Sequence, residues 1–349
     1  MHKVLVTFGG YGAGTYAGAT RMAWRTSHQL ARSGYDIAVI TDADRPGALA
    51  TGIGDRPLGA PEPGWHPDVV HAYDLARPAF VEVGREWARR CGVPLVLTPA
   101  SAATVWPDPE LGRRCLGEAD VVFVMNAKEE AETRAVARPS ADILYIPQAP
   151  DLTGTPDPER FRGRYGITGP MVLFLGRRVP SKGHSVLLDA APLVWGTLSD
   201  ATFVFAGPGG DDDISSRHDR RLIDVGPLEE LAKHDALAAA DVLCLPTGAD
   251  LFPLVFAEAW SCGRPVVSAD FPGVADVVRD GVDGLVARRT PRDLAAALLR
   301  LLGDEELRRR LGAAGRRRVA DAMSWERVAT VVAKGYHAAS GAWASGAHS

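Results

Sequence analysis

Short apolar runs alternate with longer amphipathic segments along most of the chain. Strands that are apolar on both sides need helices over both faces of their sheet, and helical patterns such as RMAWRTSHQLARSG, ended by Gly34, stand between the runs. This alternation is typical of parallel βαβ units. In the first half it predicts strands at Lys3–Phe8, Ile37–Thr41, Val69–Ala72, Leu95–Thr98, Val121–Met125 and Ile143–Ile146.

The amino-acid composition changes over residues 147–158, PQAPDLTGTPDP. This stretch is rich in proline and turn formers and predicts a linker. The alternation then restarts. A chain of 349 residues is longer than one core usually serves, so we expect two doubly wound α/β domains. Their expected bounds are residues 1–150 and 151–320, with a final helix and tail at 321–349. The second set of strands is predicted at Met171–Leu175, Thr202–Ala206, Leu222–Val225, Asp241–Leu245 and Pro265–Ser268.

Composition narrows the class of protein. Hydrophobic residues make up 46% and charged residues 23%, and the net charge of −4 provides no basic field for nucleic acid. No apolar run approaches the roughly 20 residues of a membrane span, and the start, MHKVLVTFGG, reads as a strand and not as a signal peptide. The cysteines at 91, 115, 244 and 262 show neither metal nor disulfide spacing. We therefore expect a cytoplasmic protein.

Candidate chemistry appears first after the strand at Met171–Leu175. The stretch GRRVPSKGHSVLLDA places Arg177 and Lys182 in a glycine-bounded loop before a helix, beyond the carboxyl end of the strand, where doubly wound sheets bind ligands. A guanidinium and an ammonium there can clamp a diphosphate. The chain has only five lysines, which makes this one notable. The alternative is two exposed surface cations.

A second candidate stretch, GADLFPLVFAEAW, spans residues 248–260. Pro253 suits the first position of a helix, so the amide groups of Leu254 and Val255 can face an anion. Asp250 precedes that helix and Glu258 lies inside it. A carboxylate among apolar neighbours needs hydrogen-bond donors, which two vicinal sugar hydroxyls would supply. The alternative for Glu258 is a buried ion pair.

These motifs together resemble glycosyltransferase family 4 of the GT-B enzymes. The order GRxxxxKG, then [DE]-x7-E, then CGRPVV carries the resemblance, supported by GVADVVRDGVDGLV, DAMSWERVA, HPDVVHA, IPQAPD and LARSGYDIAVIT. It implies two Rossmann-like domains facing a cleft, a C-terminal helix that crosses back to the N-terminal domain, and retaining transfer without a required metal.

The resemblance also assigns roles. Arg177 and Lys182 would contact the donor diphosphate, Glu258 the ribose hydroxyls, and Asp250 the donor sugar. Gly226, after the strand at Leu222–Val225, is a further expected donor-binding residue. Since the nucleoside-diphosphate sugar is the substrate, no cofactor is expected.

The N-terminal loop GGYGAGTYAGATRMAW allows two interpretations. Gly12, Gly14 and Ala17 fit a dinucleotide fingerprint, with Asp42 closing the next strand, and would favour a nicotinamide oxidoreductase. However, the glycine-rich stretch is longer than a tight turn. In the family pattern, Gly18 occupies the place where backbone approaches the donor phosphate and sugar, and we prefer that interpretation.

Three positions depart from the family pattern. Asp250 replaces the usual glutamate, Pro253 replaces a glycine and so removes one amide donor, and Ala100 stands where a histidine commonly helps to hold the donor sugar. His71, at the end of a strand, is a candidate catalytic substitute for that histidine. Its alternative is a structural histidine.

The sequence therefore predicts a glycosyltransferase that acts on a nucleoside-diphosphate sugar and a small-molecule acceptor, in a specialised pathway such as antibiotic biosynthesis. Its expected catalytic residues are Asp250, His71, Arg177 and Lys182. Two alternatives stay open: a glycolipid or cell-wall transferase at a membrane surface, and a binding module that has lost transfer. Membrane contact is not indicated by the sequence, and neither is nucleic-acid binding.

Overall fold

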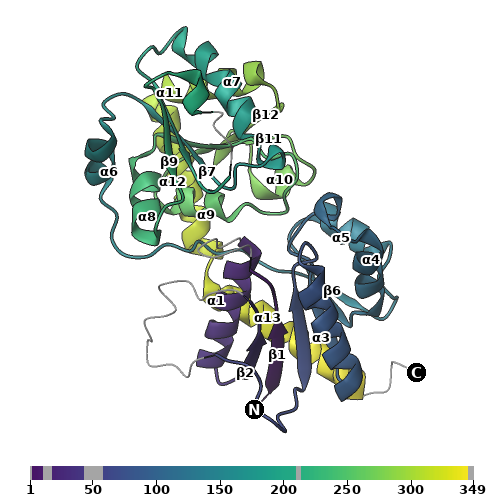
Figure 1. The fold of residues 1–349 in the computed structure, drawn as a ribbon. Helices are drawn as coiled ribbons and strands as arrows, with labels where there is room; N and C mark the ends of the chain where they lie inside the picture. Colours follow the sequence, from purple (N-terminus) through teal and green to yellow (C-terminus); the bar gives the residue numbers. More distant parts are fainter. Residues whose placement is uncertain (1, 11–17, 43–57, 210–213, 345–349) are drawn as a thin grey trace. The chain divides into compact units, whose positions relative to one another are not determined.

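The computed structural model describes residues 2–10, 18–42, 58–209 and 214–344 (Figure 1). The chain divides into two compact units. Unit 1 comprises residues 1–148 and 324–349, and unit 2 comprises residues 149–323. Both are α/β units, as the alternating pattern predicts.

Unit 1 is built on a parallel sheet in which six strands are described, in the order β2-β1-β3-β4-β5-β6. Most of its strands are short apolar runs because helices cover the sheet on both faces, and the edge strand β6 is the more exposed exception. Its elements are β1 (Lys3–Thr7), α1 (Gly18–Arg32), β2 (Asp36–Ile40), β3 (Val69–Tyr73), α3 (Pro78–Cys91), β4 (Leu95–Thr98), η1 (Ala103–Val105), α4 (Pro109–Glu118), β5 (Val121–Val124), α5 (Ala127–Arg134), β6 (Asp142–Tyr145) and α13 (Trp325–Ala344).

Unit 2 has a second parallel sheet, with the described strands in the order β12-β11-β10-β7-β8-β9. This is the strand order of a nucleotide-binding Rossmann sheet. Its elements are α6 (Pro158–Tyr165), β7 (Met171–Leu175), η2 (Pro180–Lys182), α7 (His184–Trp195), β8 (Thr202–Ala206), η3 (Ser215–Arg217), β9 (Leu222–Gly226), α8 (Glu230–Ala239), β10 (Val242–Leu245), α9 (Leu254–Ser261), β11 (Val266–Ala269), α10 (Val274–Val277), β12 (Gly284–Ala287), α11 (Pro291–Leu302) and α12 (Glu305–Ala322).

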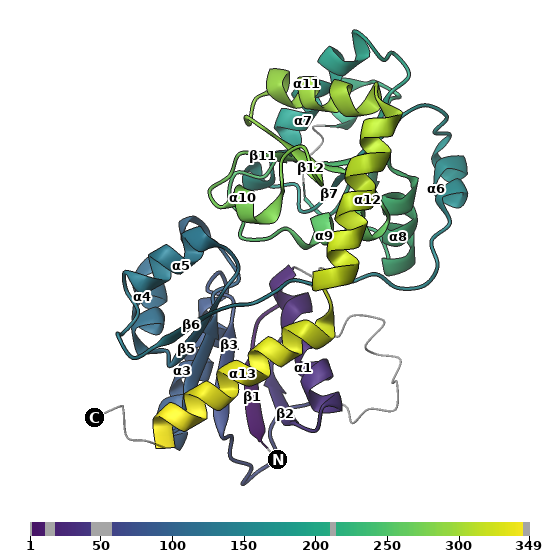
Figure 2. The same cartoon turned by 180° about the vertical axis from the view of Figure 1, so that it is seen from behind.

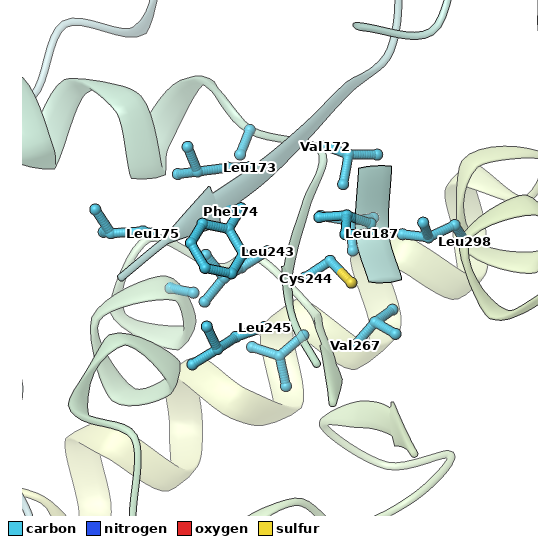
Figure 3. Close-up of a cluster of buried hydrophobic side chains, with 14 of the residues drawn as sticks. Val172, Leu173, Phe174, Leu175, Leu187, Leu243, Cys244, Leu245, Val267 and Leu298 are labelled. Carbon is cyan, nitrogen blue, oxygen red and sulfur yellow. The ribbon is translucent and has the colours of Figure 1, made fainter. Parts of the chain in front are cut away.

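The core of unit 2 is almost wholly apolar around its two central strands. Figure 3 shows Val172 of β7 and Cys244 of β10 gathered with Leu187 of α7 and Leu298 of α11. All four side chains are inaccessible to solvent. Each buried side chain of this size contributes about 1.5–3 kcal/mol, so β7 and β10 form a rigid base for the loops that follow them.

The last helix belongs to unit 1. In Figures 1 and 2, α13 runs along the sheet of unit 1, where it packs against α1 and against β3 to β6. Gly335 allows the close approach, since a Cβ there would lie 2.5 Å from the Phe123 ring. This confirms the predicted helix that returns to the N-terminal domain. None of the described helices is both long and apolar enough to cross a membrane.

The predicted strands are all present, each within one residue of its expected ends. The prediction missed β12, a four-residue edge strand that pairs only with β11 among the described residues. Its sequence, GLVA, has only one β-branched residue and follows turn-rich residues, so it does not stand out as a strand. The expected linker is also more ordered than its composition indicates, because Lys233 Nζ donates to Asp151 O and Asp157 N donates to Asp235 Oδ1.

Candidate functional site

The strand order of unit 2 reverses between the neighbouring strands β7 and β10. In open α/β sheets, ligands bind beyond the carboxyl ends of the strands at this point. The loops that follow β7 and β10 are the two stretches that carry the predicted phosphate-binding and sugar-binding residues. The fold therefore brings them to one edge of the sheet.

Backbone hydrogen bonds hold these two loops together. Gly248 N donates to Ser181 O at 2.8 Å, and Thr247 Oγ1 lies 3.2 Å from the same oxygen. Gly183 has φ 75°, and a Cβ there would collide with the Pro246 carbonyl oxygen, so only glycine fits. Arg289 donates from Nε to Pro246 O at 2.9 Å and from Nη2 to Pro180 O. One guanidinium thus bridges both loops.

Lys182 and Asp250 form an ion pair at this edge, between Nζ and Oδ2. Their side chains are 18% and 15% exposed, so the pair is shielded but reachable. We expected these groups to contact the diphosphate and the donor sugar respectively. In the structure they contact each other, so an anion that binds Lys182 must share its ammonium with Asp250.

Arg177 and Gly226 lie at the carboxyl ends of β7 and β9. Arg177 is half-buried, directly after Gly176. Its neighbour Arg178 pairs instead with Asp224 of β9. Gly226 has φ 63° and donates its amide to Asp224 Oδ1 at 2.9 Å. These contacts fix the loop at the carboxyl end of β9. Among the cations after β7, Arg177 is the nearest to the strand in sequence.

The helix α9 begins beside the ion pair. Pro253 is its N-cap, so the helix starts at Leu254, one residue later than predicted. The first amides of a helix have no acceptor within it, which makes the Leu254 and Val255 amides available donors by position. The positive end of the helix dipole adds to their attraction for an anion.

Glu258 lies on α9 with 2% of its surface exposed. Its Oε1 accepts from Lys233 Nζ of α8 at 2.8 Å. The sequence offered either sugar hydroxyls or an ion pair as its partner, and the structure contains the ion pair. Within the part of the chain that the structure describes, Lys233 is the only side chain that bonds this carboxylate.

His71 is inaccessible to solvent, and both ring nitrogens are used inside unit 1. Nδ1 lies 2.8 Å from Tyr336 Oη of α13, and Nε2 lies 2.8 Å from Thr98 Oγ1 of β4. Burial lowers the pKa of His71 well below 6.5, so the ring is neutral at pH 7. These contacts favour the structural alternative for His71, and we do not include it in the proposed site.

The remaining predicted positions lie in unit 1. Gly18 is the first residue of α1 and is exposed. Gly12, Gly14 and Ala17 lie outside the described residues. Asp42, the acid of the dinucleotide interpretation, accepts from Gly10 N at 2.6 Å and pairs with Arg77 at 3.5 Å.

Sequence reasoning missed Lys233 and Arg289. Lys233 could have been found, because it is one of only five lysines and faces the otherwise unexplained Glu258. Arg289 is one of many arginines, and no local pattern marks it. Among the described residues, no group of three or more histidine, cysteine or acidic side chains could hold a metal ion.

Two Rossmann-like units, with cations and a helix N-terminus at the switch point of the second, are the arrangement expected of GT-B glycosyltransferases. The sequence family described as glycosyl transferases group 1 matches residues 169–304. D-inositol 3-phosphate glycosyltransferase of Geodermatophilus obscurus is 35% identical over 315 residues, covering 80% of this chain and 68% of its own length. The chain therefore belongs to the glycosyltransferase family 4 type of GT-B enzymes.

One further sequence relative is also a glycosyltransferase, and two solved structures have the same fold. Phosphatidyl-myo-inositol mannosyltransferase of Mycobacterium tuberculosis is 34% identical over 214 residues, covering 58% of this chain and 56% of its own length. The solved structure of Anabaena HepE with UDP and glucose has a TM-score of 0.78 and 18% identity, covering 96% of this chain and 99% of that one. Sucrose-phosphate synthase of Thermosynechococcus elongatus has a TM-score of 0.76 and 18% identity, covering 97% and 98%. These two structures share the fold.

Proposed function

We propose that the protein is a retaining glycosyltransferase that moves a sugar from a nucleoside-diphosphate sugar to a small hydroxylated acceptor. The observation that carries this proposal is the charged edge at β7 and β10, where Lys182 and Asp250 meet beside the start of α9. Arg177, Lys182 and the first amides of α9 bind the diphosphate. Glu258 binds the ribose, and Asp250 lies by the donor sugar.

Charge development explains why these groups suit the reaction. When the bond between the sugar carbon and the phosphate oxygen breaks, negative charge grows on the diphosphate and positive charge on the sugar. Fixed cations and helix amides stabilise the diphosphate without having to reorganise. Asp250 lies next to Lys182 and can offset the positive charge on the sugar. Since the chain itself supplies cations at the diphosphate, the proposal requires no divalent metal.

The acceptor attacks from the face that the phosphate leaves. The bond from its oxygen to the sugar carbon forms as the phosphate bond breaks, and the acceptor proton passes to a phosphate oxygen. No protein nucleophile is needed for that step. The configuration at the sugar carbon is retained.

The relatives favour a polyol acceptor. One is named for D-inositol 3-phosphate and another for phosphatidyl-myo-inositol. We propose a soluble cyclic polyol or its phosphate, and none of these names supports antibiotic biosynthesis. A cytoplasmic location stays a prediction.

The test is a thermal-shift panel of nucleoside diphosphates and their sugars, followed by transfer assays with the sugars that bind. We expect at least one nucleoside diphosphate to raise the melting temperature, and product to form with a polyol acceptor in the presence of EDTA. The product should keep the donor's anomeric configuration in NMR spectra. If no nucleotide binds, the proposed function is wrong.

Two alternatives each rest on one observation. The name of the mycobacterial relative favours a lipid acceptor, which predicts transfer to phosphatidylinositol vesicles but not to free polyols. The departures at Asp250 and Ala100 favour a binding module, which predicts nucleotide binding without transfer or sugar release.

A further inference from the structure

Lys233 lies at an unusual place for a lysine. It is 7% exposed, and its Nζ lies 2.8 Å from Glu258 Oε1, 2.7 Å from Asp151 O and 3.4 Å from Glu230 Oε2. The ammonium therefore joins three parts of unit 2: the segment that enters it, the helix α8 and the helix α9. Its hydrogen bonds hold the side chain in one position.

Stability alone does not explain this arrangement. Burying an ammonium and a carboxylate costs several kcal/mol for each ion, and well-packed apolar residues of similar volume are often as stabilising as the pair. A buried carboxylate beside a proposed ligand site therefore indicates a use for the carboxylate itself. The Lys233 ammonium neutralises the Glu258 carboxylate and so offsets part of the cost of burying it.

The pair also fixes how Glu258 can meet a ligand. With Oε1 held by Lys233, the carboxylate cannot rotate freely on its long side chain, and the structure records no partner for Oε2 among the described residues. Each carboxylate oxygen accepts more than one hydrogen bond. Oε2 and the second lone pair of Oε1 thus keep a fixed direction and the capacity to accept further hydrogen bonds.

The helix that carries Lys233 is itself held in place. The next two residues bind the same entering segment: His234 Nδ1 lies 3.0 Å from Thr153 O, and Asp235 accepts from Asp157 N at 2.7 Å. Asp235 also receives a two-pronged contact from Arg160. Because these contacts fix α8, the helix that carries Lys233 is held in place independently of Glu258.

We propose that Lys233 is a positioning residue for nucleotide recognition: it orients Glu258 so that the carboxylate selects donors that have ribose hydroxyls. This inference rests on the proposed function. It assigns to the Lys233–Glu258 pair the discrimination between ribose and deoxyribose, in addition to its contribution to the fold.

The test compares the affinity of UDP with that of 2′,3′-dideoxy-UDP by calorimetry. If another nucleoside diphosphate gives the larger thermal shift, that nucleotide and its dideoxy form are used. Hydrogen bonds to a charged group contribute enough that we expect the wild-type protein to prefer the ribonucleotide by about 10- to 100-fold. Lys233→Met should reduce this preference to near unity, mainly by weakening binding of the ribonucleotide.

The controls separate positioning from folding. Lys128→Met removes an exposed lysine of α5 that pairs with Glu132, and it should keep the full preference. If Lys233→Met does not fold, Lys233→Gln replaces it: the glutamine side chain is uncharged and one atom shorter, so it cannot hold Glu258 Oε1 and Asp151 O as the ammonium does, and the preference should again fall. A purely structural lysine would lower the melting temperature of the variant but leave the preference unchanged.

Each outcome has a distinct meaning. A preserved preference in the folded Lys233 variant overturns the positioning role and leaves the proposed function standing. A wild-type protein that binds both nucleotides equally overturns the Glu258 assignment together with the role of Lys233. Failure of the wild-type protein to bind any nucleoside diphosphate overturns the proposed function itself.

Discussion

Glu129 of unit 1 and Glu258 of unit 2 lie in comparable places and differ in their partners. Each is on a helix that follows a sheet strand, α5 after β5 and α9 after β10, and the two residues are 5% and 2% exposed. Glu258 has the Lys233 ammonium at 2.8 Å. Glu129 accepts from Met125 N at 2.7 Å, while its Oε1 has no hydrogen-bond partner among the described residues.

The partner decides what each carboxyl group can do. Burial raises the pKa of Glu129 to about 8, so this group is neutral at pH 7 and acts as part of a helix cap. Glu258 keeps a neutralising cation and sits at a sheet edge that gathers further charges. The sheet edges differ in a similar way: the Lys182–Asp250 pair of unit 2 is 18% and 15% exposed, whereas the Arg77–Asp42 pair of unit 1 is 33% and 52% exposed, and Ala100 stands at the family's histidine position. The difference fits our proposal that unit 2 binds the donor.

Lys182→Ala gives the largest expected effect and tests the unit 2 side of this comparison. Removing a preorganised cation from the diphosphate should lower the turnover of transfer by about 10²–10³-fold. Steady-state transfer assays measure this, and circular dichroism checks that the fold is intact. Lys128→Ala, an exposed lysine of unit 1, should retain wild-type turnover. Near-normal turnover of the Lys182 variant would remove the diphosphate assignment.

Glu129→Gln tests the unit 1 side. The pKa of Glu129 is 4.5 in the unfolded chain and about 8 in the folded one, so the folded state holds a proton that the unfolded state releases between these values. The contribution of this protonated carboxyl group to the free energy of unfolding is complete below pH 4.5. It falls by about 1.4 kcal/mol for each pH unit as the pH rises from 4.5, and it is lost once the pH has passed through 8. Glutamine keeps an acceptor for Met125 N and cannot ionise.

Urea unfolding at several pH values between about 5 and about 9 measures this difference. The wild-type protein should lose free energy of unfolding relative to the variant as the pH rises. Glu86→Gln, which changes an exposed side chain of α3, should follow the wild-type curve. Parallel curves for the wild type and Glu129→Gln would show that Glu129 is not buried as described.

Gly312→Ala and Gly335→Ala compare how each unit holds its long C-terminal helix. A Cβ at Gly312 of α12 would collide with the Gly263 carbonyl beside α9, and one at Gly335 of α13 would lie 2.5 Å from Phe123. Overpacking at either site should cost about 1–3 kcal/mol of unfolding free energy. Only Gly312→Ala should also weaken nucleotide binding, because α9 carries Glu258.

Gly163→Ala is the control for these two variants. It lies on α6, and a Cβ there meets nothing within 4 Å. Helix propensity alone predicts a gain of about 0.5–1 kcal/mol. Equal loss of nucleotide affinity in Gly312→Ala and Gly335→Ala would contradict the assignment of the donor to unit 2.

Local patterns predicted much of this molecule, and long-range pairing explains what they missed. The strands and the Lys182 and Asp250 loops were predictable because apolar runs and turn residues act over a few positions. The surroundings of His71 were not predictable from its local pattern, because its partner Tyr336 lies 265 positions away. The partner of Glu258 lies 25 positions away on another helix, and only the packing of α8 shows that Lys233 faces it.

Ala100→Gly gives the smallest expected effect and tests the edge of unit 1. Ala100 has φ 56°, a left-handed conformation that costs alanine about 1–2 kcal/mol and glycine little. Glycine should therefore stabilise the protein by up to about 1 kcal/mol after its greater chain entropy is counted. Ala102→Gly, at φ −62° in the same loop, should instead destabilise it by about 0.5–1 kcal/mol. If Ala100→Gly lowers transfer as Lys182→Ala does, the β4 edge takes part in the reaction and the contrast between the two units fails.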